Sequence, residues 1–221
     1  MEILLSRLKE CILTECLPKS TLENIIIPAG KITDYPKGAA VFQIHDTVRD
    51  ICVLLTGKIN LSYCTKDGQH VLHDSLLPPR LVGLDLICTK TKISPYMALA
   101  AEDSRIFSFP ASYLLSAGKI PEPERQACVE RLLMLLSQSN MKKEYRIAIL
   151  TQSGLRDRIM TYLTMQANRR GSSSFAIPFN REELAAFLGV NRSALSHEFG
   201  KLRGEGIIDF RHNEFHILEK Q

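Results

Sequence analysis

The chain has 221 residues, a net charge of +4 at pH 7 and 45% hydrophobic residues, a length that suits two small domains. No apolar run approaches about 18 residues, the length of a membrane span. The opening stretch, Met1–Leu13, carries the acids Glu2 and Glu10 and predicts an amphipathic helix in place of a signal peptide. The six cysteines, at positions 11, 16, 52, 64, 88 and 128, have no paired spacing, which is typical of reduced thiols. We therefore expect a cytoplasmic protein with no membrane partner.

Between Tyr35 and Pro110 the sequence consists of short strand-like runs separated by turn residues. The runs are Ala40–Ile44, Ile51–Leu55, Ile59–Cys64, His70–Leu76 and Ile106–Phe109. Asp67-Gly68, between two of these runs, is a strong signal for a tight hairpin. This regular alternation predicts a small antiparallel barrel or sandwich.

A long helix is predicted from the prolines Pro121 and Pro123 to about Leu150. Apolar residues follow one another at alternating spacings of four and three, the pattern of a two-stranded coiled coil. The predicted dimer seam is Val129, Leu133, Leu136, Asn140, Lys143, Ile147 and Leu150. A polar Asn140 on the seam would fix register. The alternative is a helix that packs on its own barrel through Leu132 and Leu135.

A hinge is predicted at Thr151–Gly154, where the helical pattern stops. Beyond it we expect an amphipathic helix over Leu155–Gln166 and a flexible loop over Arg169–Ser174. A short strand over Phe175–Phe179 follows.

The stretch Asn180–Phe199 predicts two short helices joined by a tight turn. Asn180 can cap the first helix, with Glu183 closing a capping box, and Asn191 can cap the second. Gly189 supplies the turn. The inward residues are expected to be Leu184, Ala185, Leu188, Leu195, Phe199 and Leu202. This is the packing pattern of a DNA-binding helix-turn-helix, although an ordinary helical hairpin shares part of it.

The residues Gly206–Leu218 predict a hairpin that turns near His212-Asn213, which would make the helix-turn-helix a winged one. The net charge alone does not indicate nucleic-acid binding, but its placement does. Four basic residues gather around the second helix and this hairpin: Arg192, Lys201, Arg203 and Arg211.

The order of barrel, long helix, hinge and winged helix-turn-helix resembles the cyclic-AMP receptor protein/FNR (Crp/Fnr) family of bacterial transcription regulators. The motifs that carry the resemblance are Tyr35–Gly38, Leu54–Leu61, Lys66–Gly68, Val82–Gly83, Ala98–Pro110, Arg156–Ile159 and Asn191–Ser196. The resemblance implies an α+β fold with an N-terminal double-stranded β-helix (jelly-roll, cyclic-nucleotide-binding-like) domain. It implies a β-roll sensor with an N-terminal helix over 1–120, a dimerisation helix and hinge over 121–152, and a winged helix-turn-helix domain over 153–221.

By this resemblance the second helix of the motif would read the major groove of a pseudo-palindromic operator, bound by a homodimer that also contacts RNA polymerase. The expected DNA-binding residues are Arg192, Ser193, Ser196, His197, Lys201, Arg203 and Arg211. Gly200 also faces outward on that helix. Where better-known members carry an arginine this chain has His197, so a different half-site is expected.

The sensor departs from the cyclic-nucleotide-binding pattern. Leu84 stands where the family's ribose-binding glutamate would be, Ser94-Pro95 replaces the phosphate-binding Arg-Ser, and Lys143-Glu144 replaces the Thr-Ser pair. Since a phosphate without an arginine would be poorly paired, we expect no cyclic-AMP response and no bound cofactor. An unknown small effector is expected near Leu84, Asp85, Tyr96, Met97, Asn140 and Lys143.

The sequence leaves other signals open. A thiol switch would use Cys11, Cys16 or Cys128, and haem would use His70 or His73. An iron–sulfur cluster of the family type needs a close N-terminal cysteine group, and no third cysteine follows Cys16 before Cys52. DNA binding without any effector is also open.

Two other classes of function fit the sequence less well. A metal-dependent cupin would need histidines on one face of a strand, whereas His70 and His73, three apart, fall on opposite faces. No catalytic motif and no metal site is predicted, so we expect no enzyme. A protein-interaction module is the other alternative, but the outward face of the second helix lacks an aromatic anchor.

Overall fold

The computed structural model describes residues 2–64 and 70–218. The chain forms two compact units, Met1–Ser139 and Asn140–Gln221. The division falls inside one long helix, α6 (Glu122–Leu150), so the last turns of this helix belong to the second unit. The predicted domain limits at 120 and 152 stay a prediction.

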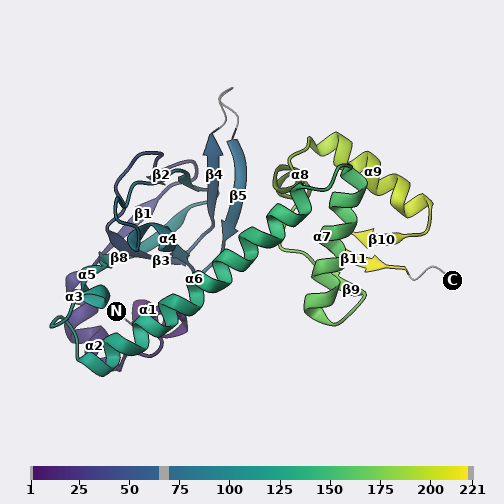
Figure 1. The fold of residues 1–221 in the computed structure, drawn as a ribbon. Coiled ribbons are helices and arrows are strands. Elements are labelled where there is room, and N and C mark those ends of the chain that lie inside the picture. The colour runs from purple at the N-terminus through teal and green to yellow at the C-terminus, as the bar shows by residue number, and fades with distance from the viewer. Residues whose placement is uncertain (1, 65–69, 219–221) are drawn as a thin grey trace. The chain divides into compact units, whose positions relative to one another are not determined.

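The first unit contains a roll of two four-stranded antiparallel sheets (Figure 1). One sheet has the order β1 (Lys31–Tyr35), β8 (Ser104–Pro110), β3 (Asp50–Thr56), β6 (Leu81–Val82). The other has the order β2 (Ala40–Phe42), β7 (Met97–Ala100), β4 (Ile59–Cys64), β5 (His70–Leu76). The predicted jelly-roll class is confirmed. The expected hairpin turn at Asp67-Gly68 lies outside the described residues.

The roll is built around side chains from both sheets. Val53, Ile59 and Phe109 are fully buried in one continuous core. No residue of β1 is buried, and the strand lies at the edge of its sheet, where it pairs with β8. Two short helices complete the roll, α4 (Leu84–Ile87) and α5 (Ser112–Leu115).

The N-terminal segment packs its apolar residues into the same core. The predicted amphipathic helix is present as α1 (Glu2–Glu10), which ends earlier than expected, and it is followed by turns. Three contiguous short helical pieces come next: α2 (Lys19–Thr21), η1 (Leu22–Ile26) and α3 (Ile27–Ala29). The fully buried apolar residues of the segment are Leu8, Leu13, Leu17, Leu22 and Ile26.

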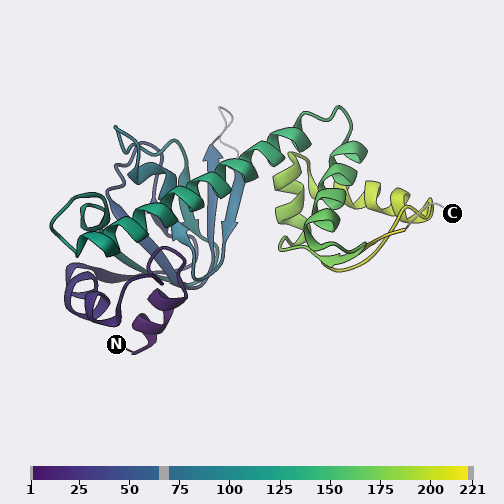
Figure 2. The same ribbon diagram turned by 60° about the horizontal axis from the view of Figure 1, so that its bottom comes forward.

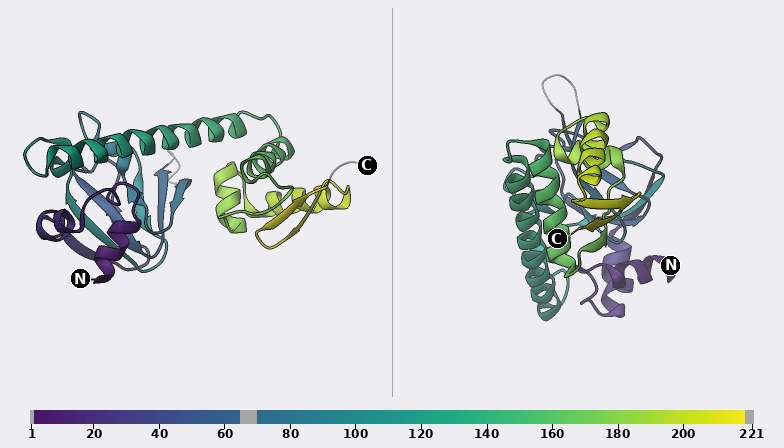
Figure 3. Two further views of the ribbon diagram at one scale, coloured as in Figure 1. Left: turned by 90° about the horizontal axis from the view of Figure 1, so that it is seen from below. Right: turned by 90° about the vertical axis from the view of Figure 1, so that its right-hand side faces the viewer.

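The first half of α6 runs along the roll in both turned views (Figures 2 and 3). Cys128 and Leu132 are buried in the core of the roll, with Leu135 and Leu136 packed against it. Leu133, by contrast, is 59% exposed. The helix therefore presents two apolar faces: the alternative packing on the barrel is present, and part of the predicted seam remains uncovered in the single chain.

The second unit combines three helices with a small sheet. Its elements after α6 are α7 (Leu155–Arg170), β9 (Ser174–Ala176), α8 (Arg181–Leu188), α9 (Arg192–Gly204), β10 (Ile208–Arg211) and β11 (Glu214–Ile217). The sheet has the antiparallel order β10-β11-β9, and the hairpin β10–β11 is the predicted wing, turning at His212 with φ of 53°. No helix in the described part of the chain is long and apolar enough to cross a membrane.

Two predictions in this unit were wrong in extent. The loop expected from Arg169 begins later, because α7 continues through Arg170 and ends at Gly171 with φ of 62°. In its left-handed conformation, the Gly171 amide donates hydrogen bonds to the carbonyls of Ala167 and Asn168. The positive charges of Arg169 and Arg170 stabilise the negative end of the helix dipole. The strand expected over Phe175–Phe179 is shorter in the structure, where β9 ends at Ala176. Phe179 is nevertheless buried.

Candidate nucleic-acid interface

The first helix of the predicted motif, α8, begins with the expected capping box. The Asn180 Oδ1 accepts a hydrogen bond from the Glu183 amide at 2.9 Å, and the Asn180 amide donates to the Glu183 carboxylate at 3.0 Å. The helix ends at Gly189, whose φ of 70° is a left-handed conformation that side chains rarely adopt. The turn between the helices is thus set by residues identified from the sequence.

The second helix, α9, is capped by Asn191, whose Oδ1 accepts a hydrogen bond from the Ala194 amide at 2.7 Å. Its inner face consists of Leu195, Phe199 and Leu202, each at most 1% exposed. Because these residues recur every three or four positions, the opposite face of the helix is left to solvent. That exposed face carries Arg192, Ser196, His197 and Gly200.

The predicted DNA-binding residues do not all have the same freedom to contact DNA. The Ser193 hydroxyl donates to the Asn191 side chain at 2.8 Å, so it already supports the cap of α9. Lys201 lies 3.8 Å from the carboxylate of Glu198. Arg192 is exposed and has no ion-pair partner among the described residues.

The wing and the end of α9 carry the remaining basic residues. Arg203 forms an ion pair with Asp209 at 2.8 Å, and its guanidinium lies 5.2 Å from the Phe210 ring centroid. Arg211 is exposed at the end of β10, next to the turn of the wing. Arg203 is therefore already paired with a carboxylate of its own unit, whereas Arg211 is exposed at the surface and can contact DNA.

Two arginines that were not predicted as site residues hold the end of α8. Arg146, from the last turns of α6, donates to the Phe187 carbonyl at 3.4 Å and stacks 4.9 Å from the centre of that ring. Arg158, from α7, donates to the Leu188 carbonyl at 3.3 Å and to the Gln152 carbonyl at 3.0 Å. Cations at a helix C-terminus satisfy carbonyls that lack an intrahelical partner. The only signal in the sequence was that Arg158 belongs to the family motif Arg156–Ile159.

Arg181, also missed from the sequence, connects both helices of the motif to the wing. Its guanidinium lies 4.5 Å from the ring centre of Phe199 in α9, 4.7 Å from that of Phe210 in β10 and 5.0 Å from that of Phe215 in β11. Desolvation by these rings lowers the pKa of Arg181. Since the three rings come from separate elements, the spacing of residues along the chain gave no sign of this cluster.

In the roll, two of the predicted effector residues share a partly buried hydrogen bond. The Tyr96 hydroxyl donates to the Asp85 carboxylate at 2.5 Å, and Tyr96 is 1% exposed. Burial, and then the charge of Asp85, raise the pKa of Tyr96. The Tyr96 ring lies 5.8 Å from that of Phe42 and 5.9 Å from that of Tyr63. Aromatic side chains thus fill this part of the roll.

The other residues predicted for the effector site lie on both units. Leu84 and Met97 are partly buried in the first unit. Asn140 and Lys143 lie on α6 within the second unit. A shared effector site made of these residues stays a prediction.

Two family models match: the cyclic nucleotide-binding domain over residues 32–119 and the Crp-like helix-turn-helix domain over residues 157–221. The transcriptional activator protein anr of Pseudomonas aeruginosa is 27% identical over 96% of this chain and 88% of its own length. The transcriptional activator protein FnrA of Stutzerimonas stutzeri is 25% identical with the same coverage, 96% and 88%.

A solved structure shares the fold. The c-di-GMP responsive global regulator CLP of Xanthomonas campestris superposes with a TM-score of 0.66 at 13% identity, covering 88% of this chain and 96% of that one. The two family models follow one another along the chain in the order of the two units. Together with relatives that match almost its whole length, they establish that the protein belongs to the Crp/Fnr family of transcription regulators.

Proposed function

We propose that the protein is a dimeric regulator that places α9 in the major groove and recognises a pseudo-palindromic operator. The observation that carries this proposal is the division of α9 into a buried face and an exposed polar face that begins with Arg192. Arg192 can bind guanine O6 and N7 with two hydrogen bonds or hold a phosphate. Ser196 and His197 lie on the same face and would contact base edges or phosphates.

The wing would add contacts to the DNA backbone. Arg211 lies beside the turn of the wing with its side chain exposed, so it can meet a phosphate. Lys201 and Arg203 contribute positive charge, but their carboxylate partners Glu198 and Asp209 reduce the net attraction.

The proposed dimer would form along the uncovered face of α6. Leu133 is 59% exposed and Ile147 is 54% exposed, and both belong to the predicted seam with Val129, Leu136, Asn140, Lys143 and Leu150. Large apolar side chains on an exposed helix face are typical of an interface between chains. A second copy of the helix would cover them and would present two recognition helices to two half-sites.

The effector is proposed to be a small molecule other than cyclic AMP. A cyclic phosphate placed near α4 would meet the Asp85 carboxylate instead of an arginine, and like charges in a partly buried site repel. Leu84, in the same short helix, offers no hydrogen bond to a ribose.

The role in transcription regulation also suggests a cellular location and a further protein partner. A regulator must work where the bacterial chromosome lies, so we propose a cytoplasmic protein. Since two relatives are named transcriptional activators, we also propose RNA polymerase as a partner.

The proposal is tested by selecting bound fragments from a random pool of duplex DNA. The expected winner has two half-sites about one helical turn apart, and its affinity falls steeply with salt. Because a missing effector could block binding, the selection is repeated with extract from the source cells. Failure to enrich a sequence under both conditions would reject the DNA-binding role.

Substituting Arg192 with alanine tests the site itself. We expect Arg192→Ala to weaken binding to the selected operator by about 1–3 kcal/mol, because a bidentate contact is lost. Arg80→Ala, which removes an exposed arginine from the first unit, is the matched control and should leave the affinity unchanged. Both are measured by fluorescence anisotropy with labelled duplex, and equal affinities for the two variants would exclude Arg192 from base recognition.

A further inference from the structure

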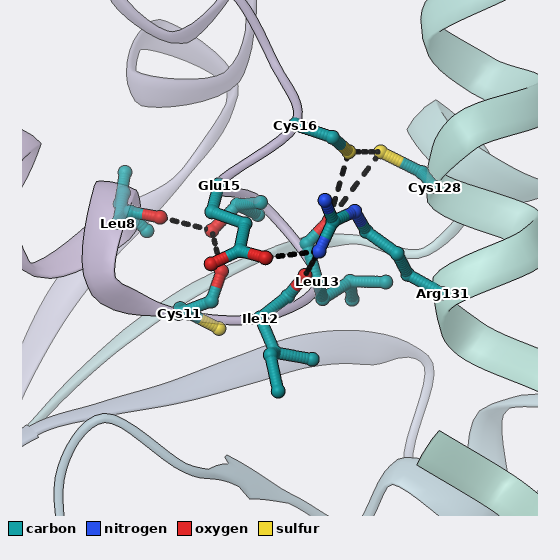
Figure 4. Close-up of polar contacts among 9 residues, drawn as sticks. Leu8, Cys11, Ile12, Leu13, Glu15, Cys16, Cys128 and Arg131 are labelled. Atoms are coloured by element: carbon teal, nitrogen blue, oxygen red, sulfur yellow. Dashed lines mark hydrogen bonds and ion pairs between the residues drawn. The ribbon is translucent and has the colours of Figure 1, made fainter. Parts of the chain in front are cut away.

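Two cysteines that are 112 positions apart in sequence lie side by side in the first unit. The Cys16 Sγ and the Cys128 Sγ are 3.5 Å apart, and each is 3.5 Å from the carbonyl oxygen of Leu13 (Figure 4). Cys16 belongs to the turns that follow α1, whereas Cys128 lies on α6. We propose that Cys16 and Cys128 form a reversible intramolecular disulfide when the protein meets a hydroperoxide such as hydrogen peroxide.

Contacts made by Arg131 keep the segment that carries Cys16 next to the helix that carries Cys128. Arg131, one turn after Cys128 on α6, forms an ion pair with Glu15 and donates a hydrogen bond to the Ile12 carbonyl at 3.2 Å. These contacts attach the segment before Cys16 to the helix that carries Cys128. A disulfide needs the sulfurs to approach from 3.5 Å to about 2.05 Å. The turn segment can make that small shift more easily than the helix, because its backbone is not fixed by a continuous hydrogen-bond ladder.

The two thiols differ in access, which gives each a separate role. Cys16 is partly exposed, so a dissolved peroxide can reach it, whereas Cys128 is fully buried. Burial, and then the neighbouring Cys16, raise the pKa of Cys128, while the charge of Arg131 opposes that increase. Cys16 is therefore the group that meets the oxidant, and Cys128 is the group that completes the bond.

The chemistry balances with one peroxide. The Cys16 thiolate attacks one peroxide oxygen, the O–O bond breaks, and the departing hydroxide takes up a proton as water, leaving a sulfenic acid. The Cys128 sulfur then attacks the Cys16 sulfur, the S–O bond breaks, and a second water leaves with the Cys128 proton. Two thiols lose two electrons, and one hydrogen peroxide is reduced to two waters.

The third cysteine of this region is not part of the pair. Cys11 is buried, and Figure 4 shows its sulfur directed away from Cys16 and Cys128. Burial also raises the pKa of the Cys11 thiol, which disfavours the reactive thiolate. Cys11→Ser is thus a control that removes a neighbouring thiol without touching the pair.

The test treats the reduced full-length protein with one equivalent of hydrogen peroxide and maps its peptides without reduction. The expected product is one crosslinked peptide joining Cys16 and Cys128, with a mass lower by two hydrogen atoms and full reversal by dithiothreitol. Cys11→Ser should give the same crosslink. Cys128→Ala should stop at a Cys16 sulfenic acid that dimedone traps, and Cys16→Ser should leave Cys128 reduced.

Other products would overturn the inference. Sulfinic acid at Cys16 with Cys128 still reduced would show that the second step does not occur. A crosslink through the exposed Cys64 or Cys88 would show that access, not proximity, decides the product. Because the peptide map of the unsubstituted protein gives this answer alone, a variant that fails to fold does not affect it. The result is independent of DNA binding.

Discussion

A substitution at Gly200 is expected to change the stability of α9 and its proposed DNA binding in opposite directions. It lies in the middle of the helix on the exposed face, near Ser196 and His197. A Cβ added at this position would meet no heavy atom within 4 Å. The backbone therefore gives no reason for a glycine, and glycine costs about 1 kcal/mol relative to alanine in a helix interior. We expect Gly200→Ala to stabilise the folded protein by about 0.5–1 kcal/mol.

The same substitution should weaken operator binding if the backbone of α9 approaches the bases closely. A methyl group would then occupy the space that DNA needs, and we expect at least a tenfold loss, about 1.4 kcal/mol. Gly204→Ala is the matched control, since a Cβ there also meets nothing within 4 Å but lies at the last residue of the helix.

Stability is measured by urea unfolding followed by circular dichroism, and affinity by anisotropy with the selected operator. A lower urea midpoint for Gly200→Ala would show that position 200 cannot accept a side chain in the middle of α9. An equal loss of affinity in Gly204→Ala would refute close approach at Gly200, because both variants stiffen the helix but only one adds a group to the proposed contact face.

Three further predictions concern the supports of the motif and the thiols. Asn180→Ala should lower the free energy of unfolding by about 1 kcal/mol through loss of the α8 cap, and an unchanged urea midpoint would contradict the capping role. Arg181→Met should lower the free energy of unfolding by about 1 kcal/mol, because it removes the cation from three aromatic rings, and Arg181→Lys should lower it less. Equal melting temperatures for the two variants would exclude the cation–π contribution. Burial raises the pKa of Cys52 to about 12, so at pH 7.5 iodoacetamide should alkylate Cys64 well before Cys52, and the Cys52 rate should grow with pH as its thiolate forms; equal rates in a mass-spectrometric time course would contradict this.

The helix-turn-helix could be predicted because its signals are local. Asn180, Gly189 and Asn191 mark helix ends through their own side chains or backbone conformations, and Leu195 and Phe199 follow the helical period. Local rules of capping and periodicity were therefore sufficient to place both helices, their turn and their buried face. The wing was identified in the same way, from a short hairpin pattern.

Contacts between distant segments could not be predicted. Three rings from three elements meet Arg181, and neither their spacing nor the residue types indicate it. The thiol pair was equally hidden, since Cys16 and Cys128 were recognised only as separate candidates for a switch. The polar edge strand β1 was missed because it lacks the alternation that burial on one face would impose. The loop expected at Arg169 resembled a linker in composition, yet the helix continues to a glycine cap.

The attachment of α8 to its neighbours has a mechanical consequence. Arg146 lies on the last turns of α6, and its bond to the Phe187 carbonyl joins these turns to the end of α8. Ile149, from the same turns, is buried in the core of the second unit. The last turns of α6 and the helix-turn-helix are therefore expected to move together. A rotation of the end of α6 must move α8 as well, or break the hydrogen bond between Arg146 and the Phe187 carbonyl. In the proposed dimer, a signal that reorients the two helix ends against each other would change the separation of the two α9 helices without contacting either of them.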